Sequence, residues 1–181
     1  AILNLTEKLL NDRLAASSKL VLGSALVSIY TIAISPDSKQ LIAGTKSGLM
    51  IQWDLSSGKA IRRFSGHCEA IYSCDISPDR TRLVSGSHDK TVRIWNLKTG
   101  ELLHTFEGFQ EAVFTCVFSP SGKQILTATL DESTVQLWDC QTEKLIRTLE
   151  VDRSDGSNCT FSPNGRHVLT ASQDKTIRLW D

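Results

Sequence analysis

All tryptophans and all prolines of this sequence recur at one fixed interval. Successive prolines lie 42, 42 and 43 residues apart, and successive tryptophans lie 42, 43 and 42 residues apart. They are Pro36, Pro78, Pro120 and Pro163, followed 17 or 18 residues later by Trp53, Trp95, Trp138 and Trp180. A repeat of this length predicts four copies of one small unit, which bury their apolar faces by stacking side by side.

Each unit has the sequence pattern of four β-strands. In the second unit, residues 71–76, 82–87, 91–95 and 101–106 are rich in apolar and β-branched side chains. Alternation in the first of these segments predicts that Tyr72, Cys74 and Ile76 share one face. The turn Ser77-Pro78-Asp79-Arg80 has counterparts at 35–38, 119–122 and 162–165. Four antiparallel strands per unit predict an all-β fold of propeller blades.

Several segments match one known repeat. They are Gly66-His67, residues 84–96, which end in Ile-Trp-Asn, and residues 171–181, which end in Leu-Trp-Asp. Over about residues 17–181 the chain resembles the WD-repeat (WD40) family. The resemblance implies β-propeller blades that end near the four tryptophans, and it identifies no single member of the family.

The resemblance also implies a buried hydrogen-bond set that ties the strands of each blade together. The second blade has all its members, and the third and fourth have parts of it: His67, Ser85, Asp89, Trp95; Thr127, Asp131, Trp138; Thr170, Asp174, Trp180. The same residue types could form a nucleophilic triad. Incomplete sets are tolerable in a stabilising network but not in a catalytic one, so we expect a structural role. The first blade has Ala43 and Ser47 at the positions of the serine and the aspartate, so we expect it to be the blade least stabilised by this hydrogen-bond set.

In the WD-repeat family, partners commonly bind where the chain enters each first strand. The corresponding positions here are Tyr30, Tyr72 and Phe114, together with the residues at the turn before each third strand: Lys46, His88, Leu130 and Gln173. Aromatic side chains are typical anchors of interfaces. Phe109, which replaces the usual histidine, is a further candidate for this surface. The alternative is that the rings only cap the core.

The expected function is therefore a protein-interaction scaffold that binds other proteins or peptides and has no enzymatic activity. A sensor or regulatory segment of a larger signalling NTPase is an alternative, and a propeller hydrolase is less favoured. No cofactor or metal is expected. Cys74, Cys116 and Cys159 share one repeat position, which favours small core residues over a metal site, and no C-x-x-C spacing occurs.

The charge balance excludes some classes of partner. The 20 basic and 20 acidic residues cancel, so we expect no binding to nucleic acid or to a membrane surface. The sequence contains no run of about 18 apolar residues, so we expect no membrane span. Five cysteines, an odd number, argue against a disulfide framework and favour a reducing compartment, cytoplasmic or nuclear.

The N-terminal segment leaves the closure of the propeller open. Residues 1–16 have leucines at helical spacing, which predicts a short helix, although they also align with the end of a worn blade. Residues 17–181 form the repeat region. A strand at 19–22 could complete the last blade of a four-bladed ring, or two copies could form an eight-bladed ring. We favour a part of a longer, commonly seven-bladed propeller. An open last blade would favour self-association.

Overall fold

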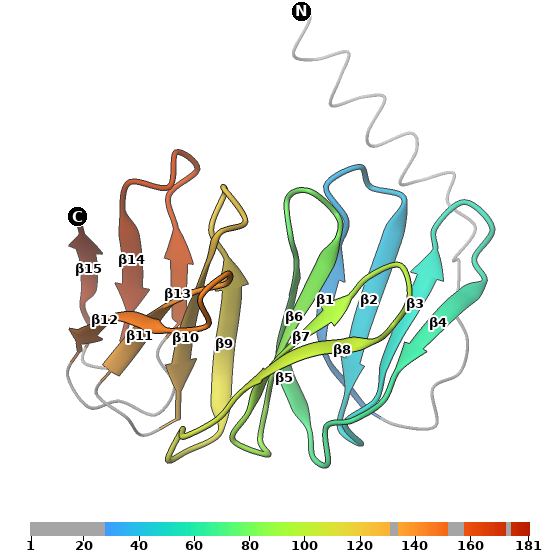
Figure 1. Cartoon of the computed structure of the whole chain (residues 1–181), viewed down its shortest axis with the longest axis horizontal. Coiled ribbons are helices and arrows are strands. Elements are labelled where there is room, and N and C mark those ends of the chain that lie inside the picture. Colours follow the sequence, from blue (N-terminus) through green and yellow to red (C-terminus); the bar gives the residue numbers. More distant parts are fainter. Residues whose placement is uncertain (1–27, 131–133, 152–157, 173–174) are drawn as a thin grey trace, which may run out of the picture.

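The computed structural model describes residues 28–130, 134–151, 158–172 and 175–181. Every regular element in these ranges is a β-strand, and the strands form four antiparallel sheets in chain order (Figure 1). The all-β prediction is confirmed. The sheets comprise β1 (Ile29–Ile34), β2 (Gln40–Thr45), β3 (Met50–Asp54) and β4 (Ala60–Phe64); β5 (Ile71–Ile76), β6 (Arg82–Ser87), β7 (Val92–Asn96) and β8 (Leu102–Phe106); β9 (Val113–Phe118), β10 (Gln124–Thr129), β11 (Thr134–Asp139) and β12 (Leu145–Glu150); and β13 (Asn158–Phe161), β14 (Val168–Ala171) and β15 (Ile177–Trp180).

The Ser-Pro turns close the hairpin between the first two strands of each blade. In the second blade, the Ser77 hydroxyl donates to Asp79 Oδ1 at 2.6 Å and accepts from the backbone N–H of Arg82 at 2.9 Å. The first and fourth blades repeat both bonds. Short polar side chains that bond to the nearby backbone favour turns, so the recurring Ser-Pro sequence fixes where each hairpin reverses.

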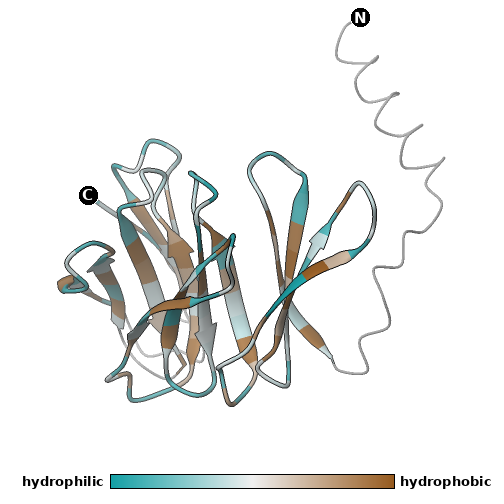
Figure 2. Cartoon of the chain, turned by 45° about the vertical axis from the view of Figure 1, so that its right-hand side comes forward, coloured by the Kyte–Doolittle hydropathy of each residue, from teal (hydrophilic) through white to brown (hydrophobic). Residues whose placement is uncertain are grey.

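The blades pack face to face, with their first strands side by side. β5 lies between β1 and β9, and β13 follows β9 (Figure 1). Three apolar clusters fill the spaces between successive blades, and the apolar bands on the strands are visible in Figure 2. Between the first two blades, Met50 and Phe64 face Ile71, Cys74 and Trp95. Burial of these faces is the main stabilising contribution of such stacks.

The repeated cysteines each belong to one of these clusters. Cys74, Cys116 and Cys159 are 7%, 0% and 2% exposed. Burial raises the pKa of the Cys74 thiol to about 12 and raises those of Cys116 and Cys159 as well. Thiols that stay protonated behave as small apolar residues. The repeat position therefore has the core location that the sequence predicts.

The first strands contain a β-bulge that simple alternation missed. Ile71 lies opposite Ser87 and Ser73 lies opposite Gly86, so Tyr72 is the extra residue between two ladder pairs. A bulge shifts the alternation by one residue. The prediction that Tyr72 shares a face with Cys74 and Ile76 is wrong, because Ile71 occupies that core face instead. The same shift occurs in β1 at Tyr30 and in β9 at Phe114.

Several expectations lie outside the described residues: the helix or worn blade at 1–16, the strand at 19–22, and the positions of Asp131, Gln173 and Asp174. Among the described residues, no helix is long and apolar enough to cross a membrane.

Candidate functional site

The second blade contains a continuous side-chain hydrogen-bond chain. His67, from the loop before β5, lies with Nδ1 2.7 Å from Asp89 Oδ2 and with Nε2 2.8 Å from Ser85 Oγ. The indole N–H of Trp95 donates to the same Ser85 oxygen at 2.9 Å. Ser85 lies on β6, Trp95 on β7 and Asp89 in the turn between them. The chain therefore joins the loop and both strands, in the contacts that the resemblance implies.

Burial separates this constellation from solvent. The His67 side chain is 0% exposed, and Ser85 is also 0% exposed. Burial by itself raises the pKa of Asp89, but the hydrogen bonds from His67 and Thr91 outweigh it and hold the pKa below its ordinary value. The backbone N–H of Cys68 donates to the same carboxylate at 3.2 Å. The serine and the histidine are thus enclosed, and their hydrogen bonds link the loop before β5 to the strands of the blade.

The third and fourth blades retain a shorter version of this chain. Trp138 donates to Thr127 Oγ1, and Trp180 donates to Thr170 Oγ1, both at 3.0 Å. Phe109 takes the place of the histidine in the third blade and packs on Trp138, with 5.6 Å between ring centroids. Phe109 is 7% exposed. The expectation that Phe109 extends the partner surface is therefore wrong, because its ring fills the interior of the blade.

Three bulged residues form one continuous row of rings, which we call the aromatic row: Tyr30, Tyr72 and Phe114. Tyr30 and Tyr72 stack with centroids 5.8 Å apart and planes 8° apart. Phe114 tilts against the other side of Tyr72 at 5.6 Å. Tyr30 is 45% exposed and Phe114 is 40% exposed, while Tyr72 is half-buried between them. The row thus presents aromatic surface from three blades at the start of their first strands.

The turns before the third strands lie beside this row. The backbone N–H groups of Lys46, His88 and Leu130 each donate at 2.8 Å to the carbonyl two residues before a ring of the row. The His88 ring also packs edge-on against Tyr72, at 5.9 Å, and pairs with Glu69. Sequence reasoning did not single out Glu69; its only signal was an acidic residue three positions before Tyr72.

The family model of the IFT122 first β-propeller matches residues 28–181. The chain belongs to this family. The prediction of a WD-repeat propeller is confirmed, since this is a propeller of that type and the sheets have the blade architecture. The comparison with curated proteins gave no match.

In this IFT122-type propeller, the described residues include no group of three or more His, Cys, Asp or Glu side chains that could hold a metal ion. All five cysteines are free. Two groups of side chains therefore remain as candidates. The hydrogen-bonded chain around His67 is buried, whereas the aromatic row is exposed.

Proposed function

We propose that the chain is a protein-interaction module that binds a partner polypeptide on the aromatic row. The observation that carries this proposal is the continuous exposed ring surface of Tyr30, Tyr72 and Phe114. The family, an IFT122-type propeller, supports the scaffold role in general. The partner surface itself rests on the geometry of the row.

The position of the rings favours recognition over core packing. Each ring stands at a bulge, while the neighbouring residues Ile71 and Val113 are 0% exposed and fill the core. Tyr72 and Phe114 are therefore not part of the apolar core between blades, although the rings contact one another at its edge. Large rigid rings bury much apolar area at a low cost in side-chain entropy, which makes them effective interface anchors.

Polar groups at the margin of the row add selectivity. Lys46 is exposed, and His88 and Glu69 form an exposed pair about half open to solvent on each side. Exposed charges at the edge of an interface steer a partner and fix its register more than they add affinity. The row therefore suits a partner segment that brings apolar side chains flanked by charged residues.

The buried chain of His67, Ser85 and Asp89 supports a non-catalytic role for the domain. Enzymatic use of this triad would require a reacting atom about 3 Å from Ser85 Oγ. That oxygen is enclosed and already bonded to His67 and Trp95. We therefore expect no hydrolase activity at this site, and no contact of the described residues favours the alternative of an NTPase sensor.

The test is quantitative affinity capture with the full chain, comparing wild type with the double variant Tyr72→Ala and Phe114→Ala. Each anchor ring contributes about 2 kcal/mol to a typical interface. The double variant should therefore weaken partner binding by on the order of 1000-fold. Its melting temperature should change by only a few degrees, because the rings lie outside the core.

A matched control is Leu103→Ala on β8, which also removes a side chain of similar exposure, 50%. This variant should capture the same partners as wild type. If the double variant retains every partner that Leu103→Ala retains, the aromatic row is not the binding surface.

A further inference from the structure

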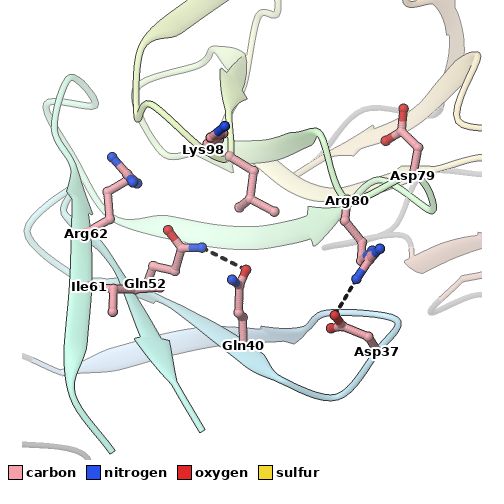
Figure 3. A pocket seen from close by; sticks show the side chains of 9 residues that line it. Asp37, Gln40, Gln52, Ile61, Arg62, Asp79, Arg80 and Lys98 are labelled. Carbon is pink, nitrogen blue, oxygen red and sulfur yellow. Dashed lines mark hydrogen bonds and ion pairs between the residues drawn. The ribbon is translucent and has the colours of Figure 1, made fainter. Parts of the chain in front are cut away.

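A polar cavity lies between the first two blades, at the opposite end of the first strands from the aromatic row. Its volume is about 330 Å³, which lies at the lower end of the range for ligand pockets. The first blade contributes Gln40, Gln52 and Arg62, and the second contributes Arg80 and Lys98 (Figure 3). It opens beside the Ser-Pro turns, since Asp37 and Asp79 of those turns also line it.

Gln52 is out of place in its repeat position. The equivalent residues of the other blades are Ile94, Leu137 and Leu179, all apolar. Gln52 is nevertheless 2% exposed. Its Nε2 donates to Gln40 Oε1 at 2.9 Å, but its Oε1 has no hydrogen-bond partner among the described residues. A buried carbonyl oxygen without a donor costs about 1–3 kcal/mol, so the residue is not there to stabilise the blade.

Arg62 adds an unused donor next to this acceptor. It lies directly opposite Gln52 in the β3–β4 pairing. Its Nη1 donates to the carbonyl of Thr99 at 2.9 Å, while its buried Nε has no partner among the described residues. One wall of the cavity thus has an acceptor and a donor without partners among the described residues, and both atoms are covered, so a ligand reaches them only when these two side chains turn toward it. A peptide group, which carries an N–H and a carbonyl, can satisfy both.

The charges around the cavity leave a positive excess. Arg80 pairs with Asp37 across the two blades. The Asp79 carboxylate accepts from the hydroxyls of Ser77 and Thr81 and from the backbone N–H of Thr81. Among the described residues, no carboxylate pairs with Arg62 or Lys98, and Lys98 is exposed at the rim. An incoming carboxylate would therefore be attracted to these two cations.

We infer that this cavity is a second binding site, which takes an acidic peptide segment. When the Gln52 side chain turns toward the cavity, its Oε1 accepts from a backbone N–H of the segment. An Asp or Glu carboxylate of the segment accepts from Arg62 and Lys98. The site is independent of the aromatic row, because it uses other residues at the other end of the blades.

The test is titration of the full chain with the capped peptide acetyl-Gly-Glu-Gly-amide, followed by NMR of the side-chain amide signals of Gln40 and Gln52. Both signals should shift and saturate. Replacing Glu by Gln in the peptide should weaken binding at least tenfold. Failure of the Glu peptide to shift these signals, or equal binding of the two peptides, overturns the inference.

The decisive variant is Gln52→Ile, which installs the residue that the second blade has at this position. It should weaken binding at least tenfold and raise the melting temperature, because it removes a buried unpaired carbonyl. Retained affinity in Gln52→Ile contradicts the site. Lys98→Glu, a change at an exposed turn, should also weaken binding at least tenfold without affecting the fold, and unchanged affinity in this variant overturns the role of the charge.

Two controls separate this site from others. Gln124→Ala alters the equivalent cavity between the third and fourth blades, where Leu137 stands in place of Gln52, and it should leave the affinity unchanged. The Tyr72→Ala and Phe114→Ala double variant should also bind the peptide normally. If the double variant fails to bind the acidic peptide, the two sites are not independent. If it loses only the captured partner, the result concerns the aromatic row and not the cavity.

Discussion

At the scale of single residues, the stability of the second blade depends on one shared hydroxyl. Ser85 Oγ is bonded both to the indole N–H of Trp95 and to Nε2 of His67. In the third blade, Thr127 Oγ1 accepts from the Trp138 indole and donates to the Gln136 carbonyl at 3.4 Å, and a phenylalanine replaces the histidine. In the first blade, Ala43 at this position offers no hydroxyl at all. The blades therefore differ in how many buried polar groups depend on this position.

Replacing Ser85 by Ala should destabilise the chain by about 1–3 kcal/mol, because it leaves the buried nitrogens of both His67 and Trp95 without this partner. The comparison variant is Thr127→Val, which removes the hydroxyl but keeps the branched shape, and it should cost less, about 1 kcal/mol, since Trp138 is the only side chain that loses a partner. Urea denaturation followed by tryptophan fluorescence measures both. Equal costs in the two variants would contradict the shared role of the Ser85 hydroxyl.

Sequence reasoning predicted the chain around His67 well but missed Gln52. The family resemblance identifies residue types at fixed positions, and His67, Ser85, Asp89 and Trp95 lie where it implies. Gln52 carries no motif. The available signal was a polar residue at a repeat position that is apolar in the other three units, and its meaning depends on burial, which only the structure reveals.

At the scale of elements, close approach between blades depends on small residues in the second strands. A Cβ atom at Gly86 on β6 would lie 2.7 Å from Cγ1 of Val113 on β9. Gly44 on β2 faces Ile71 in the same way, at 2.8 Å from Cγ2. The equivalent residue of the third blade is Ala128, which is buried in the next inter-blade cluster. Successive blades are therefore spaced by different side chains at one position.

Replacing Gly86 by Ala should destabilise the chain by about 1–3 kcal/mol, because the added methyl group overpacks the contact with Val113. The matched change in the other direction, Ala128→Gly, should cost about 0.5–1 kcal/mol from backbone entropy, with any lost packing adding to it. Equilibrium denaturation of both variants gives the comparison. A Gly86→Ala protein as stable as wild type would show that the contact with Val113 can relax to admit a methyl group.

The strands themselves were predictable, but their register was not. The segments 71–76 and 82–87 were predicted with the observed bounds of β5 and β6, because hydrophobic pattern and turn residues both mark them. The bulge at Tyr72 was missed because Ile71 and Tyr72 are both apolar, so alternation cannot show which of them faces the core. A bulge is a backbone feature set by pairing with β6, and a single strand's sequence does not contain it.

At the scale of the whole molecule, the two ends of the blade stack present apolar faces. Ile177 in the fourth blade is 75% exposed, whereas its equivalents Met50, Val92 and Val135 are 0% exposed. In the first blade, Ile32 is 61% exposed, whereas its equivalents Cys74, Cys116 and Cys159 are buried. In each interface between described blades, the face that carries the residue equivalent to Ile177 packs against the face of the next blade that carries the residue equivalent to Ile32. The two end faces are therefore complementary to each other.

We expect copies of the 181-residue chain to associate head to tail through these faces. Such contacts produce either a closed ring or an open filament. Sedimentation velocity should show a weight-average mass that rises with concentration. Ile177→Lys should reduce this association, because it places a charge in the contact. The control Leu103→Lys, on the exposed surface of β8, should associate as wild type does. Association unaffected by Ile177→Lys would exclude these faces as the contact.

The bulges in β1, β5 and β9 have a consequence for variation. They release positions 30, 72 and 114 from filling the interior, and in the second and third blades Ile71 and Val113 fill it instead. Side chains at these three positions can therefore be exchanged without repacking the stack, so that new specificities can be selected from a library randomised there on an unchanged framework.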